Sequence, residues 1–355
     1  MATTRRTVHP LLEKQPERIT IMQYIRRILI RPEMGAIVGA IAVWVFFAVV
    51  AGDRGFLSLS GTATYLAVAA ELGILAVAAA LLMIGGEFDL SIGSVSGACS
   101  MIVTICSVEF GLDIWSSIAI ALLVSLLIGF LNGILVLRTG LSSFIVTLAS
   151  LFVVRGATIG FTRLLTGRTQ LGGLEAVPGY DLAHSIFASG IMLGGASFPI
   201  SIVWWLVLAA LATWLLLGTR FGNWIYGVGG DAQASRNMGV PVARVKIILF
   251  MLTALAACLV GIIQTVTFTG ADVLRGSNNE FLTIIAVVVG GTLLTGGYGS
   301  AIGSVFGALI FGMVRQGIVF AGVDADWYQV FLGVMLLLAV ILNRFVRTYA
   351  MEARR

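Results

Sequence analysis

Long apolar runs alternate with short polar segments along the 355 residues of the chain. A helix that spans a membrane needs about 20 predominantly apolar residues, and ten runs approximately satisfy that length. The eighth run is short, and only residues 85–89 separate the second run from the third. The pattern predicts an all-α polytopic membrane protein with about ten transmembrane helices. The predicted spans are 34–51, 62–84, 90–108, 115–137, 141–161, 199–217, 247–269, 281–295, 300–320 and 327–346.

The composition favours a membrane protein and argues against a soluble one. The chain is 59% hydrophobic and 11% charged, whereas a soluble domain carries about 25% charged residues. Its 43 glycines suit membrane helices, because small residues let such helices approach closely. The three cysteines lie inside apolar runs, and the two histidines belong to no cluster of metal ligands. We therefore expect no disulfide framework, no metal site and no catalytic residues.

The basic residues predict the orientation of the chain in the membrane. Arg and Lys gather on the cytoplasmic side of membrane proteins. If the amino terminus is inside, 16 of the 22 basic residues fall on cytoplasmic segments. We therefore expect a cytoplasmic arm (1–33), a single transmembrane domain (34–346) and a cytoplasmic tail (347–355). The net charge of +5 is explained by these cytoplasmic flanks, so no nucleic-acid partner is required.

Two loops of the predicted transmembrane domain are long enough to carry structure of their own. On the outer side, the periplasmic loop 162–198 is mixed in polarity, which favours short re-entrant or surface helices. On the inner side, residues 220–246 form a polar, basic segment rich in glycine, with the sequence RFGNWIYGVGGDAQASRNMGVPVARVK. We call residues 220–246 the cytoplasmic segment.

The cytoplasmic segment admits three interpretations. Gly227-x-Gly229-x-x-Ala232 outlines a dinucleotide-binding fingerprint, but a βαβ unit takes about 30 residues or more and the next apolar run begins too soon. A second interpretation is an inert basic loop held by the head groups of membrane lipids. The third is a short amphipathic helix on the inner membrane surface, with glycines permitting tight turns at its ends. A P-loop is excluded, because neither Lys14 nor Lys246 follows a glycine-rich loop.

A short motif occurs twice. Ile-Gly-Ser-Val-Ser-Gly-Ala at 92–98 returns as Ile-Gly-Ser-Val-Phe-Gly-Ala at 302–308, and each copy opens a predicted span. Transporters commonly contain internal repeats. The alternative is that both copies serve close helix packing through Gly-xxx-Gly pairs, here Gly93 with Gly97 and Gly303 with Gly307.

Three ordered stretches resemble the ribose/xylose-type sugar permeases of bacterial ABC importers, a branch shared with branched-chain amino acid permeases. They are the cytoplasmic segment, residues 85–94 (GGEFDLSIGS) and residues 290–300 (GGTLLTGGYGS), and the similarity covers roughly 60–340. Two departures stand out. Glu87 and Phe88 replace a single apolar residue of the usual pattern, and Asp231 stands where Asn is usual.

The resemblance implies a type II-like permease that works with several partners. These are a second permease subunit, identical or homologous, a cytoplasmic ABC ATPase that uses the ATP, and a periplasmic binding protein that delivers a monosaccharide. The chain itself would need no cofactor and would lie in the bacterial inner membrane with both termini in the cytoplasm. The resemblance also implies that the cytoplasmic segment docks on the ATPase. The residues it assigns to that coupling are Arg220, Phe221, Gly222, Gly227, Gly229, Gly230, Asp231, Ala234, Arg236 and Gly239.

Candidate path residues are the polar groups within or beside the predicted spans, because ionisable groups inside a membrane are costly and usually functional. Glu71, Asn132 and Gln264 lie within spans, while Glu87, Asp89 and Ser91 lie at an inner turn. Glu71 could instead pair with a neighbouring helix. Glu87 and Asp89 could instead stabilise the amino terminus of the third span through its dipole.

On the predicted outer face, Arg163, Arg168 and Arg275 are candidates for docking the binding protein, since such charges steer association. The alternative for each is an ordinary solvated arginine. Two other functional classes remain to be weighed. A proton-coupled secondary transporter would use Glu71, and an intramembrane enzyme would need a catalytic cluster that the sequence does not offer.

Overall fold

The computed structural model describes residues 31, 33–331, 333, 334 and 337. The chain divides into two compact units, Met1–Arg31 and Pro32–Arg355, and every element below belongs to the second. The predicted cytoplasmic arm, apart from residues 31 and 33, and the predicted tail lie outside the described residues. So does most of the tenth predicted span, 327–346.

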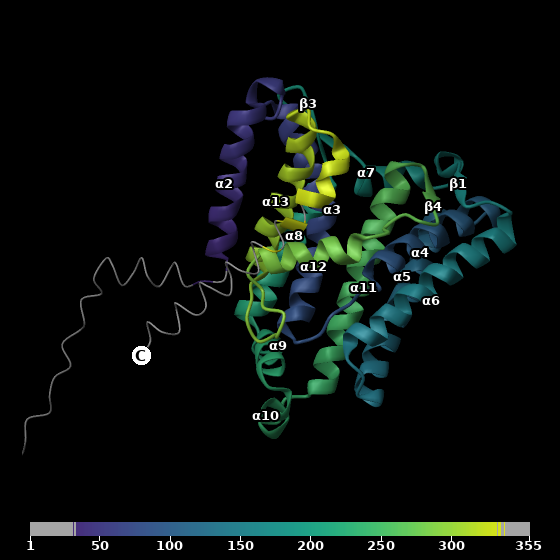
Figure 1. The fold of residues 1–355 in the computed structure, drawn as a ribbon. Helices are drawn as coiled ribbons and strands as arrows, with labels where there is room; N and C mark the ends of the chain where they lie inside the picture. Colours follow the sequence, from purple (N-terminus) through teal and green to yellow (C-terminus); the bar gives the residue numbers. More distant parts are fainter. Residues whose placement is uncertain (1–30, 32, 332, 335–336, 338–355) are drawn as a thin grey trace, which may run out of the picture. The chain divides into compact units, whose positions relative to one another are not determined.

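Helices make up most of the described part of the chain (Figure 1). Eight of them are long and apolar enough to cross a membrane. They coincide with the first seven predicted spans and the ninth. The helices are α2 (Met34–Ala51), α3 (Leu59–Ile84), α4 (Ile92–Thr104), α5 (Ile114–Thr139), α6 (Ser143–Thr166), α7 (Tyr180–Phe187), α8 (Ser201–Gly218), α9 (Arg220–Gly230), α10 (Ala232–Asn237), α11 (Val242–Thr267), α12 (Asn279–Val289) and α13 (Ala301–Phe320).

Side-chain oxygens set the start of several of these helices. The Ser58 hydroxyl accepts from the backbone N–H of Gly61 at the start of α3. The Asp113 carboxylate accepts from the N–H groups of Trp115 and Ser116 at the start of α5. Each bond satisfies a backbone donor that the first turn of a helix leaves unpaired.

Helices α3 and α4 form the interior of the described unit. Of the most apolar 18 residues of α3, 83% are buried, and the same share is buried over Ile92–Glu109, which is α4 together with the π-helical turn that continues it; the share in α6 is only 17%. Helices in a membrane associate through close packing, because lipid is as apolar as their side chains. Glycine permits that packing between α5 and α11: a Cβ added to Gly129 would lie 2.6 Å from the carbonyl oxygen of Phe250, and one on Gly133 would lie 3.0 Å from Ile247 Cα.

Helix α12 is too short to cross a membrane alone. Its 11 residues span about 16 Å, against about 30 Å for the hydrocarbon core. Its carboxyl end lies on the glycines of α13. A Cβ added to Gly303 would collide with the carbonyl oxygen of Gly290, and one added to Gly307 would collide with that of Ala286.

The segment that leads into α12 lies on the corresponding glycines of α4. A Cβ added to Gly93 would collide with the carbonyl oxygen of Gly276, and one added to Gly97 would collide with that of Arg275. The two copies of the repeated motif therefore receive the two ends of one short helix, which confirms their use in close packing.

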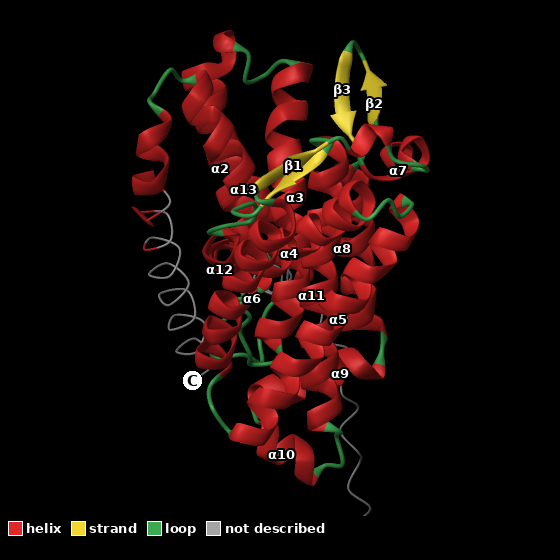
Figure 2. Ribbon diagram, turned by 90° about the vertical axis from the view of Figure 1, so that its right-hand side faces the viewer, coloured by secondary structure: helices red, strands yellow, loops and turns green. Residues whose placement is uncertain are grey.

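Short strands and the helix α7 lie at one end of the unit, and α9 and α10 lie at the opposite end (Figure 2). Strand β1 (Gln170–Gly172) pairs antiparallel with β4 (Gly270–Asp272). Strand β2 (Gly190–Leu193) pairs with β3 (Ala196–Pro199) in a hairpin. The predicted loop 162–198 thus contains one short helix, as expected, and also three strands that the sequence did not predict.

Candidate functional site

The three stretches that carry the family resemblance meet at the end of the unit that holds α9 and α10. The backbone N–H of Gly297 donates to the carbonyl oxygen of Ile84 at 2.8 Å. A Cβ added to Gly229 would collide with that same oxygen and would lie 2.7 Å from the nitrogen of Gly297. We call residues 84–91, 226–231 and 290–300 together the glycine junction.

The backbones of the glycine junction touch each other directly. Gly86 and Gly296 have φ angles of +84° and +77°, which residues other than glycine rarely adopt. A Cβ on Gly296 would lie 2.7 Å from Gly86 Cα and 2.8 Å from the oxygen of Gly229. The Tyr226 hydroxyl donates to the carbonyl oxygen of Gly299 at 3.0 Å. At these glycines the backbone of α9 contacts the end of α3 and the segment 290–300 directly, with no side chain between them.

The cytoplasmic segment forms two helices and the start of α11, so the prediction of a single helix is wrong. The predicted glycine turn is present at Gly239, which has a φ angle of +83° just after α10. The Asp231 carboxylate separates the two helices, because it accepts from the N–H groups of Gln233 and Ala234 at 2.9 and 2.8 Å and starts α10. Gly227 and Gly229 lie inside α9. The string 224–226 is helical, so the strand of a dinucleotide-binding unit is absent from this part of the described chain.

The predicted coupling residues fall into two groups. One group is turned inward or partly covered: Phe221, Gly222 and Gly229. The other is exposed at the surface of α9 and α10: Arg220, Gly227, Gly230, Asp231, Ala234, Arg236 and Gly239. The sequence interpretation missed Met238, which is 85% exposed beside them. Its signal was a methionine within an otherwise polar segment.

An ion pair ties the glycine junction to α11. The Lys246 ammonium group contacts the Glu87 carboxylate, and their side chains are only 17% and 9% exposed. Glu87 is the charge by which the chain departs from its family pattern. Lys246 lies in α11, shortly after α10. The pair therefore links the turn between α3 and α4 to the helix that follows the cytoplasmic segment.

A buried polar network lies next to that pair. Asn132 donates to the Ser91 hydroxyl at 3.0 Å, and Ser91 donates to the Asp89 carboxylate at 2.6 Å. Thr253 donates to the other Asp89 oxygen at 2.8 Å. Burial raises the pKa of the Asp89 carboxyl, and the hydrogen bonds from Ser91 and Thr253 oppose that rise. The structure thus unites three predicted path residues and adds Thr253.

The same turn is also attached to α6. The N–H of Phe88 donates to the Ser143 hydroxyl and the N–H of Leu90 donates to the Thr147 hydroxyl, each at 3.0 Å. With the bonds to α5 and α11, the turn 85–91 contacts three spans through hydrogen bonds. The glycine junction is therefore joined to much of the helical interior.

Glu71 and Gln264, two further predicted path residues, pair with each other. The Gln264 amide donates to the Glu71 carboxylate at 2.7 Å, which joins α3 to α11. Arg275 lies close by, since its guanidinium donates to the carbonyl oxygens of Gln264 and Gly270 at 3.2 and 2.7 Å and lies over the Phe268 ring. Its donors are directed into the protein at this position.

Arg163 and Arg168 occupy a different environment from Arg275. Both are exposed, and they lie at the carboxyl end of α6 and in the loop that follows it. This places them at the end of the unit that carries the strands. Of the three predicted docking arginines, these two present their charge to the surroundings.

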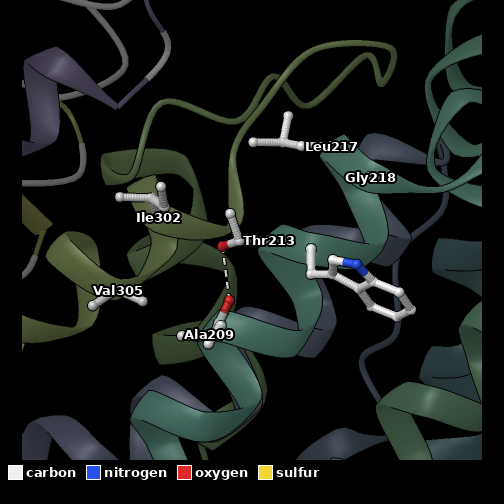
Figure 3. Close-up of a pocket in the computed structure, with 8 residues that line it drawn as sticks. Ala209, Thr213, Leu217, Gly218, Ile302 and Val305 are labelled. Carbon is white, nitrogen blue, oxygen red and sulfur yellow. Dashed lines mark hydrogen bonds between the residues drawn. The ribbon is translucent and has the colours of Figure 1, made fainter.

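An apolar groove of about 650 Å³ lies between α8 and α13 (Figure 3). The Thr213 hydroxyl in it already donates to the Ala209 carbonyl oxygen at 2.7 Å. The groove therefore suits an acyl chain of a membrane lipid rather than a polar solute. Its lining residues are Ala209, Ala210, Thr213, Trp214, Leu217, Gly218, Ile302 and Val305.

Comparisons with known proteins identify the family of the chain. The family model described as "Branched-chain amino acid transport system / permease component" matches residues 61–340. The ribose import permease protein of Escherichia coli K12 is 33% identical over 76% of this chain and 81% of its own. The xylose transport system permease protein of the same strain is 32% identical over 86% and 89%. An autoinducer 2 import system permease protein of Photorhabdus laumondii is 30% identical over 76% and 79%. No solved structure matches the chain significantly.

Proposed function

The chain belongs to the family of branched-chain amino acid transport system permease components, and from this membership we propose that it is the permease subunit of an ATP-driven sugar importer. The eight apolar helices among its described residues, together with the family, make it a multi-pass membrane protein. The relatives at 30–33% identity are permeases named for ribose, xylose and autoinducer 2. Two of these names describe import and the third describes transport, and a monosaccharide or similar polyhydroxylated solute is the class proposed here.

One observation supports the coupling mechanism above all others: the three family stretches meet in the glycine junction, directly behind the exposed residues of α9 and α10. We assign those exposed residues to docking on a cytoplasmic ABC ATPase. Asp231, Arg236 and Met238 would contact the ATPase, with Asp231 also fixing the start of α10. The inward residues Gly222 and Gly229 would hold α9 against the permease.

ATP would be hydrolysed on the partner, since the only lysines of the chain, Lys14 and Lys246, follow no phosphate-binding loop. Movement of the docked α9 would pass to the end of α3 and to 290–300 through the backbone contacts of the glycine junction. The Glu87–Lys246 pair would pass it to α11. Because α9 touches these segments without side chains between them, little of the motion would be lost in rotamer changes.

The remaining partners follow from the same proposal. A second permease subunit, identical or homologous, would complete the path, and a periplasmic binding protein would deliver the solute. In a bacterial inner membrane, α9 and α10 would then face the cytoplasm and the strands would face the periplasm. Arg163 and Arg168, exposed at the strand end, are the proposed contacts with carboxylates of the binding protein.

The complete importer, purified through a tag on this chain and reconstituted into proteoliposomes, tests the proposal. The binding protein is added on the side of the membrane that carries the strands, and ATP on the side of the ATPase. Uptake of a labelled mixture of pentoses and hexoses is then expected to require ATP and to be inhibited by vanadate. A protonophore is expected to leave uptake unchanged. Uptake by this chain alone under a proton gradient, without ATP or ATPase, would contradict the proposal and identify a proton-coupled transporter.

A further inference from the structure

An ion pair that lies outside the glycine junction occurs between two membrane helices. The Arg155 guanidinium of α6 donates to the Glu280 carboxylate of α12 at 3.2 Å. Arg155 stands near the middle of α6 (Ser143–Thr166), and Glu280 is in the first turn of α12. Charges at this depth are costly and mark functional positions in membrane proteins.

The pair is only partly satisfied. A guanidinium has five N–H donors, and the described residues accept from one nitrogen of Arg155 only. The second carboxylate oxygen of Glu280 is buried and has no hydrogen-bond partner among the described residues, and the Thr283 hydroxyl one turn further on has none either. Unpaired donors and acceptors therefore occur together, although leaving such groups unpaired costs about 1–3 kcal/mol each.

The two partners differ in their access to the surroundings. The Glu280 side chain is 1% exposed, whereas that of Arg155 is 25% exposed. Gly156 follows Arg155 on α6, about 100° around the helix, and a Cβ added to it would meet no atom within 4 Å. A partly exposed guanidinium facing hydrocarbon would be strongly destabilising. The exposed part of the Arg155 side chain is therefore better matched to water than to lipid.

We propose that Arg155, held by Glu280, lines the aqueous solute path and binds the hydroxyl groups of an uncharged, polyhydroxylated solute halfway through the membrane. The exposed N–H groups of the guanidinium donate to adjacent hydroxyl oxygens of a sugar, while the buried Glu280 carboxylate holds the guanidinium in place. This inference rests on the proposed function. It assigns α6 and the first turn of α12 to the path.

Thiol labelling of the reconstituted importer tests the position of the path. A thiol reacts as the thiolate and so needs water. In a Cys106→Ser background, Gly156→Cys is expected to react with charged, membrane-impermeant methanethiosulfonates at least tenfold faster than the matched control Val207→Cys, which is exposed on the apolar helix α8. Equal and negligible rates would overturn the proposal. They would indicate instead that lipid or a packed second subunit covers this face.

Two further measurements test the pair itself. Adding Glu280→Gln leaves Arg155 as an uncompensated positive charge, so the ratio of anionic to cationic reagent rates at Gly156→Cys should rise severalfold. A purely structural pair would leave that ratio unchanged. D-ribose, D-xylose or D-glucose at high concentration should slow labelling when the pair is intact and not in Glu280→Gln. Protection by none of the three would refute hydroxyl binding.

These outcomes separate the inference from the proposed function. ATP-driven uptake together with an unlabelled Gly156→Cys would reject the path along α6 and leave the importer intact. Labelling and sugar protection without ATP-driven uptake would retain the solute site and reject the importer.

Discussion

Removing Lys246 should reveal how strongly the glycine junction depends on its ion pair. Lys246→Met keeps a side chain of similar length but leaves the Glu87 carboxylate, which is 9% exposed, without its cation. The substitution therefore isolates a charge in a nearly dry site. Steric effects should be small, because the flexible methionine side chain adapts to irregular cavities.

The burial of the pair sets the size of the effect. Removing one member of a buried ion pair typically costs about 3–5 kcal/mol, because the remaining charge is left buried without compensation. We expect a loss of stability in this range for Lys246→Met.

Thermal unfolding of the purified subunit in detergent measures this loss. Arg244→Gln is the matched control, since Arg244 is exposed in the same turn of α11. The double variant Glu87→Gln, Lys246→Met should recover much of the stability, because no charge is then left unpaired. In an importer whose permease carries Lys246→Met, the ATPase should hydrolyse more ATP for each solute molecule imported. If Lys246→Met unfolds at the same temperature as Arg244→Gln, the pair does not stabilise the junction.

Three further changes address other contacts. Gly229→Leu should lower the folded yield, because its Cβ would collide with Ile84, whereas Gly230→Leu, which meets no atom within 4 Å, should fold and weaken co-purification with the ATPase. Equal yields would argue against the assignment. Glu71→Gln should slow uptake at unchanged ATPase binding, and unchanged uptake kinetics would limit Glu71 to packing with Gln264. Gly303→Val should reduce the unfolding temperature more than Gly35→Val, because a Cβ at position 35 meets no atom within 4 Å. Similar unfolding temperatures would contradict the close packing of α12 on α13.

The sequence predicts the spans because membrane helices must be long and apolar, whatever their partners. The segment 34–51 coincides with α2, and the short eighth run corresponds to α12. The strand pairing of Gln170 with Asp272 depends on residues 102 positions apart. Three-residue strands leave no periodic pattern from which to predict that pairing.

The candidate site was predicted residue by residue but not as an arrangement. Glu87 was recognised as a departure from the family pattern, yet its partner Lys246 is 159 residues away. The glycines of 220–246 were interpreted as turns, whereas Gly229 serves a helix contact that only the approach of α3 explains. Glu280 was overlooked because it directly precedes the predicted eighth span, where a charge resembles an ordinary loop residue.

The position of α12 is determined largely by residues of other helices. Its carboxyl end lies by its backbone on Gly303 and Gly307 of α13, and the segment that leads into it lies by its backbone on Gly93 and Gly97 of α4. A single methyl group on one of those four glycines would therefore displace α12 or the segment before it. Substitutions at side chains of α12 that touch none of these glycines should instead leave the helix in place and change only the surface that it presents.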